Sequence, residues 1–143
     1  MESREIEKYS FWWSEVRLVV AAVALFIGGV PPILLIAPPA MYAATALLLK
    51  LSWIISGVAA GYLLYRWHDR GQKLFGHKDH QDTFAFLVLA VSGLNLGFAG
   101  IFGLNLGMQV TMNRFIFLLV GILYLYAAWQ LWKSAQKHKG DIF

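Results

Sequence analysis

The chain has 143 residues, of which 59% are hydrophobic and only 14% are charged, and its mean hydropathy is +0.59. This balance excludes an ordinary soluble domain and predicts a polytopic membrane protein whose first partner is the lipid bilayer. The lack of cysteine excludes disulfides and thiolate chemistry, and the net charge of +4 comes from basic residues that flank apolar runs, which favours lipid headgroups over nucleic acid.

Four apolar runs are long enough to cross a bilayer as helices, which takes about 20 residues each. They predict an all-α membrane protein, a four-helix transmembrane bundle that forms a single domain over residues 1–143. We expect the spans at about residues 12–36, 41–66, 83–107 and 113–132, with a polar loop at 67–82 and a polar tail at 133–143.

The first span contains a predicted helix break at Pro31 and Pro32, because each proline removes an intrahelical hydrogen bond. Two interpretations stay open. Either the span runs from Val16 to Ile36, or a helix begins near Tyr9 and stops at Val30.

Basic residues gather on one side of the predicted bundle, in the N-terminal arm, the central loop and the tail. These are Arg4, Lys8, Arg17, Arg66, Arg70, Lys73, Lys78, Lys133, Lys137 and Lys139. An even number of spans places the three segments together, and the positive-inside rule then predicts that both termini and loop 66–82 are cytoplasmic. We expect the bacterial inner membrane or an equivalent energy-transducing membrane.

Glycines form a predicted helix-packing face on the third span and a shorter stripe on the second. The residues are Gly57, Gly61, Gly93, Gly97, Gly100 and Gly107. Small residues let helices approach closely in lipid. Two such faces exceed what one small bundle needs. The leading prediction is therefore a non-enzymatic structural or assembly subunit, either a homo-oligomer or a partner of other membrane subunits.

Lys50 lies nine residues into the second span, about 13 Å from its start. A charge at that depth costs on the order of 3 kcal/mol unless it finds partners. We expect no carboxylate within a span away from its inner end. Three interpretations remain: Lys50 donates to the carbonyls of Ile27 and Gly28 that the prolines free, it extends to the outer surface, or it contacts a solute.

Asn95 and Asn105 occupy a near repeat, GLNLG, in the third span. Asparagines in membrane helices commonly bond across to a neighbouring helix. In the alternative interpretation they line a polar path together with Lys50. The second predicted function is therefore an oligomeric channel or transporter for a small anion or neutral solute.

The polar loop carries the residues that could suggest a metal site. His77 and His80, completed by Asp82 or His68, have zinc-binding side chains. The glycines and basic residues of this loop favour a solvated segment instead, so no metal and no cofactor are predicted. Asp82 or Thr83 is expected to cap the third span. No catalytic arrangement falls at membrane depth, and no catalytic residue is predicted.

Overall fold

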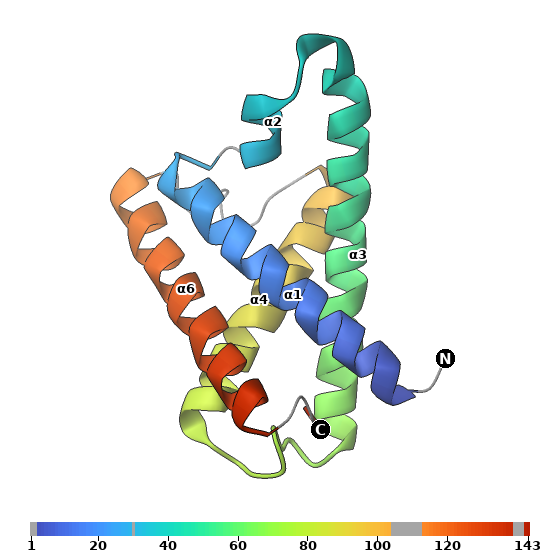
Figure 1. The fold of residues 1–143 in the computed structure, drawn as a ribbon, viewed down its shortest axis with the longest axis vertical. Coiled ribbons are helices and arrows are strands. Elements are labelled where there is room, and N and C mark those ends of the chain that lie inside the picture. Colours follow the sequence, from blue (N-terminus) through green and yellow to red (C-terminus); the bar gives the residue numbers. More distant parts are fainter. Residues whose placement is uncertain (1–2, 30, 104–112, 139–141) are drawn as a thin grey trace.

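The computed structural model of the chain describes residues 3–29, 31–103, 113–138 and 142–143. The regular elements within these ranges are all helical (Figure 1). In chain order they are α1 (Ser3–Phe26), α2 (Pro32–Ile36), the 3₁₀ turn η1 (Pro39–Met41), α3 (Tyr42–Asp69), α4 (His80–Phe102) and α6 (Arg114–Lys137).

Among the described residues, four helices are long and apolar enough to cross a membrane: α1, α3 with the preceding η1, α4, and α6. The prediction of an all-helical membrane protein with four potential spans is confirmed, as far as the length and composition of the helices can show it. The helices also extend past the expected spans, since α3 continues to Asp69, α4 begins at His80 and α6 continues to Lys137. Their polar ends can lie beyond the hydrocarbon because only the apolar part of a helix must be inside it.

The first span differs from the expected segment 12–36. Helix α1 ends at Phe26, and two glycines with left-handed backbone follow, Gly28 at φ 95° and Gly29 at φ 90°. This conformation is easily reached by glycine and terminates helices. Helix α1 therefore ends four residues before Val30, the end that one interpretation expected, and the glycines stop it before the prolines are reached.

The expected helix-breaking prolines instead begin the next element. Pro31 is the N-cap of α2, and Pro32 is its first residue. A proline fits there because the first helical residue has no intrahelical partner for an N–H. Pro38 and Pro39 play the same part at the start of η1.

Helices α3 and α4 pack through the predicted glycine faces. A Cβ added to Gly97 would lie 2.6 Å from the Cα of Gly57, so the two backbones are in direct contact. A Cβ on Gly93 would lie 2.6 Å from the Cβ of Ala60, and one on Gly100 would lie 3.0 Å from the carbonyl oxygen of Lys50. The close approach of these helices requires the missing side chains.

The glycine faces are thus used within one chain. Gly57, Gly93 and Gly97 lie against the neighbouring helix and are not available to a second subunit. Gly61 differs, because an added Cβ there would meet nothing within 4 Å. Gly107 lies outside the described residues.

The loop between α3 and α4 (residues 70–79) closes one end of the bundle. We call this end of the bundle the loop end. The backbone N–H of Phe75 donates to the carbonyl of Ile142 over 2.7 Å, and the Phe75 ring meets Phe11 of α1 edge-on. Arg66 pairs with Glu7. The first part of α1, the loop and residues 142–143 therefore lie at the same end of the bundle (Figure 1).

Candidate functional site

Arg17 is a buried cation in the middle of the bundle. Helix α1 runs diagonally across the other long helices (Figure 1). Its residues Trp13, Arg17 and Ala21 lie one turn apart on a face that lines a cavity. Arg17 is 8% exposed. Its Nη1 donates to Ser92 Oγ over 2.8 Å, and its Nη2 donates to the carbonyl of Leu89 over 3.0 Å. These two bonds fix α1 to α4.

Arg17 forms no ion pair within 4.0 Å in the described ranges, and its Nε has no hydrogen-bond acceptor there. The acid that interacts with its charge at longer range is Glu15, two residues away on the same helix. Glu15 is also buried, and its Oε1 likewise lacks a hydrogen bond. Arg17 lies nine residues, roughly 14 Å, from the end of α1. Glu15 lies near the midpoint of α1 (Ser3–Phe26), whereas the expectation that no carboxylate lies within a span away from its inner end stays a prediction.

A cavity of about 1070 Å³ opens beside Arg17, between α1, α2, α3, α4 and α6. Two of the three predicted path residues, Lys50 and Asn95, line it together with Arg17. The third, Asn105, lies outside the described residues. Val20, Leu49 and other apolar side chains form most of the wall. The cavity therefore combines an apolar surface with two cationic side chains.

Lys50 does not bond as one interpretation expected. Within the part of the chain that the structure describes, its ammonium forms no hydrogen bond with the carbonyls of Ile27 and Gly28 or with any other group. The residue is exposed. Arg114 approaches Gly28 instead, since a Cβ added there would lie 2.8 Å from Nη2 of Arg114. Lys50 thus lines the wall of the cavity without a hydrogen-bond partner among the described residues.

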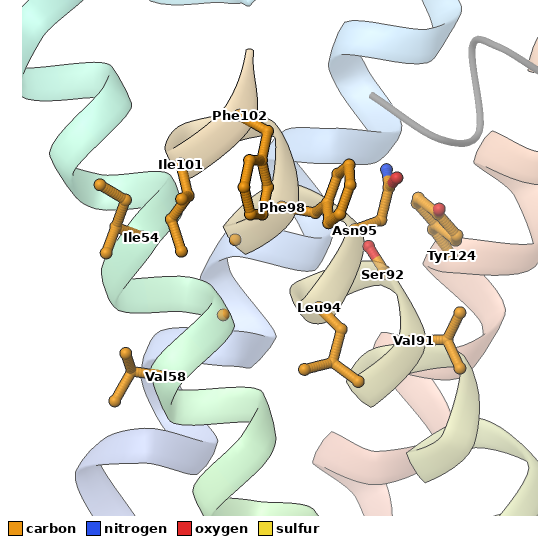
Figure 2. Close-up of a pocket in the computed structure, with 12 residues that line it drawn as sticks. Ile54, Val58, Val91, Ser92, Leu94, Asn95, Phe98, Ile101, Phe102 and Tyr124 are labelled. Atoms are coloured by element: carbon orange, nitrogen blue, oxygen red, sulfur yellow. The ribbon is translucent and has the colours of Figure 1, made fainter. Parts of the chain in front are cut away.

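A second cavity of about 750 Å³ adjoins the first and shares Ser92, Asn95 and Tyr124 with it. Figure 2 shows these polar side chains on one side of the second cavity, with Ile54 and Val58 of α3 on the other. The shared residues come from α4 and α6. They form a polar junction between two largely apolar spaces.

At the loop end, α4 begins earlier than expected and has a different cap. Asp79 is the N-cap, and its Oδ1 accepts from the backbone N–H groups of Gln81 (2.7 Å) and Asp82 (3.3 Å). These two bonds lower the pKa of Asp79 because they stabilise its ionised form. The expectation that Asp82 or Thr83 caps this helix is therefore wrong.

Asp82 joins two helices instead. It is 2% exposed, and its Oδ1 accepts from Gln130 Nε2 over 3.0 Å and from Ser134 Oγ over 2.6 Å. Both donors belong to α6. A buried carboxylate needs such donors to offset its lost hydration. Asp82 is thus a polar contact between α4 and α6.

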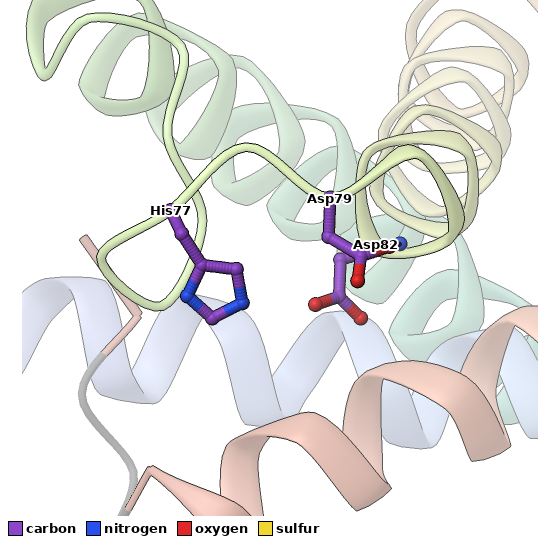
Figure 3. A group of neighbouring side chains, drawn as sticks. All are labelled: His77, Asp79 and Asp82. Atoms are coloured by element: carbon purple, nitrogen blue, oxygen red, sulfur yellow. Dashed lines mark hydrogen bonds between the residues drawn. The ribbon is translucent and has the colours of Figure 1, made fainter.

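His77, Asp79 and Asp82 form the group in the described chain whose side chains could approach one cation, with ligand atoms within 4.8 Å of one another. Figure 3 shows the His77 ring turned toward the two carboxylates. His80 and His68, considered from the sequence, are not part of this group. Both carboxylates already have structural hydrogen bonds, so we assign no metal to this group.

Sequence reasoning missed Arg17 as a site residue, because its position near the N-terminus suggested a cytoplasmic charge. The one available signal was its helical spacing with Trp13 and Ala21, which continues as a stripe toward the apolar end of the helix. Comparison with protein families, curated proteins and solved structures gives no match for this chain. The interpretation of the cavity therefore rests on its geometry.

Proposed function

We propose that this protein is a channel or transporter for a small anion, in which Arg17, Lys50 and Asn95 contact the anion. The observation that carries the proposal is the buried charge of Arg17, which lines the large cavity without an ion-pair partner in the described ranges. Unpaired ionisable side chains at membrane depth are costly and commonly mark solute or ion pathways.

The two cations occupy different depths along α4. The Lys50 backbone lies level with Gly100, whereas Arg17 bonds at Leu89 and Ser92. The eight residues from Ser92 to Gly100 correspond to roughly 12 Å. Asn95 falls between them and offers an amide donor. Cationic and polar groups at successive depths would let an anion exchange from one to the next, as conduction and transport require.

The orientation is part of the proposal. Arg17 is buried and so no longer counts among the interfacial charges of the N-terminal arm, yet the loop and the tail remain rich in Lys and Arg. The positive-inside rule then favours a cytoplasmic loop end. We propose the bacterial inner membrane or an equivalent energy-transducing membrane as the location. In this orientation Arg17 is nearer the cytoplasmic side of the cavity and Lys50 nearer the outer side.

Anion flux from liposomes tests the function, with chloride and formate as probes. Arg17→Gln is expected to lower flux at least about tenfold, because it removes the buried positive charge that offsets dehydration of the anion. Lys50→Met is expected to lower flux as well. Arg17→Lys keeps the charge and should retain part of the flux.

Lys133→Met is the matched control, since Lys133 is exposed and lies over the Trp129 ring, 4.3 Å from its centroid. Its flux should equal that of the unchanged protein. A folded Arg17→Gln variant with full flux would rule out the proposal.

A structural or assembly subunit remains the second candidate, favoured by the open position of Gly61. Val58 and Tyr65, on the same helix, are 69% and 62% exposed, so this part of α3 has room for a partner helix. The mass of the protein in nanodiscs separates the candidates. An oligomer that Gly61→Leu dissociates would support assembly, and a monomer in both cases would count against a homo-oligomer.

A further inference from the structure

The large cavity is far bigger than an inorganic anion. Its volume of about 1070 Å³ lies at the upper end of the range typical of pockets for drug-sized ligands, roughly 300–1000 Å³. Its walls include Val20, Leu49 and Leu96, which offer nothing to a hydrated ion. Apolar cavities gain from an apolar occupant, because water there lacks hydrogen-bond partners. The lining therefore favours a ligand with a substantial hydrocarbon part.

The polar part of such a ligand has one well-defined place. Arg17 is more than nine-tenths buried and lines the cavity. A guanidinium has five N–H donors, and the bonds to Ser92 and Leu89 engage only Nη1 and Nη2, while Nε has no hydrogen-bond partner in the part of the chain that the structure describes. The two cations of the cavity wall, Arg17 and Lys50, outnumber the one buried acid that interacts with Arg17, Glu15, so the remaining positive charge favours an anionic ligand. The planar guanidinium is well suited to a carboxylate.

The second cavity offers a way in from the lipid. Its wall includes Val58, Val91, Ile101 and Phe102, all exposed on the outside of helices α3 and α4. It meets the first cavity at Ser92, Asn95 and Tyr124. A molecule dissolved in the bilayer would reach these exposed apolar side chains first, and its polar group would then meet the polar junction beside Arg17.

From these observations we infer that the cavity binds a single-chain amphiphilic carboxylate such as a fatty acid, with the carboxylate at Arg17 and the hydrocarbon chain along the apolar wall. The inference rests on the anion site of the proposed function and specifies its ligand class. It also assigns the second cavity as the lateral entrance, with Asn95 and Tyr124 at the point where the ligand passes from one cavity to the other.

Binding of the fluorescent fatty acid parinaric acid tests the inference, with the full chain in nanodiscs of zwitterionic lipid at a pH where the acid is ionised. Palmitate is expected to displace the probe at least about tenfold more effectively than hexadecanol, which has the same chain length without the charge. Arg17→Gln should weaken probe binding at least about tenfold. Lys133→Gln should leave it unchanged, and Arg17→Lys, which retains the charge, should bind within a few-fold of the unchanged protein.

Equal displacement by palmitate and hexadecanol would overturn the inference, as would full binding by a folded Arg17→Gln variant. The chloride flux assay separates this failure from that of the proposed function. Arg17-dependent chloride flux without preference for palmitate would refute the amphiphile and keep the small-anion path. Arg17-dependent palmitate binding without chloride or formate flux would support the amphiphile site and refute passage of small anions.

Discussion

At the scale of single residues, Asp82 is the contact whose removal should cost most at the loop end. Asp82→Ala leaves the buried donors of Gln130 and Ser134 without their acceptor. We expect the free energy of unfolding to fall by about 3 kcal/mol. Asp82→Asn keeps a carbonyl acceptor and should cost about 1 kcal/mol. Unfolding in detergent by chemical denaturant measures both.

Asp69→Ala is the control for this prediction. Asp69 is an exposed acid whose oxygen lies 3.6 Å from Arg66, and exposed ion pairs contribute little. Its loss should change the free energy of unfolding by less than about 1 kcal/mol. Equal effects of the alanine variants at positions 69 and 82 would show that Asp82 does not connect the helices.

The residues of the site were only partly predictable. Lys50 and Asn95 stand out because polar side chains in an apolar run are visible in the sequence. Arg17 did not, because a basic residue near the start of an apolar run resembles an interfacial charge. Its burial depends on where α1 ends and on its contact with Ser92, which is 75 residues away. Contacts of that separation are not encoded in local spacing.

At the scale of helices, the contact between α3 and α4 should be intolerant of even a methyl group. Gly97→Ala would place a Cβ 2.6 Å from the Cα of Gly57 and force the backbones apart. We expect the free energy of unfolding to fall by about 1–3 kcal/mol, the usual cost of overpacking. Thermal unfolding in detergent measures the change.

Gly61→Ala is the matched control on the same pair of helices. An added Cβ there meets nothing within 4 Å, and alanine is the better helix former by about 1 kcal/mol. Stability should be unchanged or higher. A Gly97→Ala variant as stable as Gly61→Ala would mean that the helices can separate at no cost.

The approximate position of a helix could be predicted from the sequence where hydropathy was the one signal present. The hydropathy of residues 41–66 and 113–132 predicts two of the helices, and in the structure these helices continue through polar residues to Asp69 and Lys137. At the end of α1, two stop signals compete within five residues. Gly28 and Gly29 precede Pro31, and a left-handed glycine ends the helix before the proline can act.

At the scale of the whole molecule, the proposed orientation predicts which end faces the cytoplasm. The chain has no cysteine, so single cysteines can be introduced without background. A membrane-impermeant maleimide should label Ala40→Cys in intact cells, because Ala40 is exposed in the turn opposite the loop end. Lys78→Cys, at the loop end, should react only after permeabilisation. The opposite pattern would reverse the orientation.

The all-helical fold class was predictable from the sequence. In a bilayer, a long apolar run must satisfy its own backbone hydrogen bonds, and it does so as a helix. Which helices touch was not predictable. The sequence shows glycine faces on two spans, and the pairing of Gly57 with Gly97 inside one chain depends on the relative height of α3 and α4. That height is set by the loop at residues 70–79 and its contacts with Phe11 and Ile142.

The bonds of Arg17 to Ser92 and Leu89 have a thermodynamic consequence. The same side chain joins α1 to α4 and faces the cavity, so its environment exists only in the folded protein. A compound that binds there and not to the unfolded chain shifts the folding equilibrium by mass action, by about 2.7 kcal/mol at a concentration of 100 Kd. A melting-temperature screen of candidate acids would therefore reveal the natural occupant, and the response should vanish in Arg17→Gln.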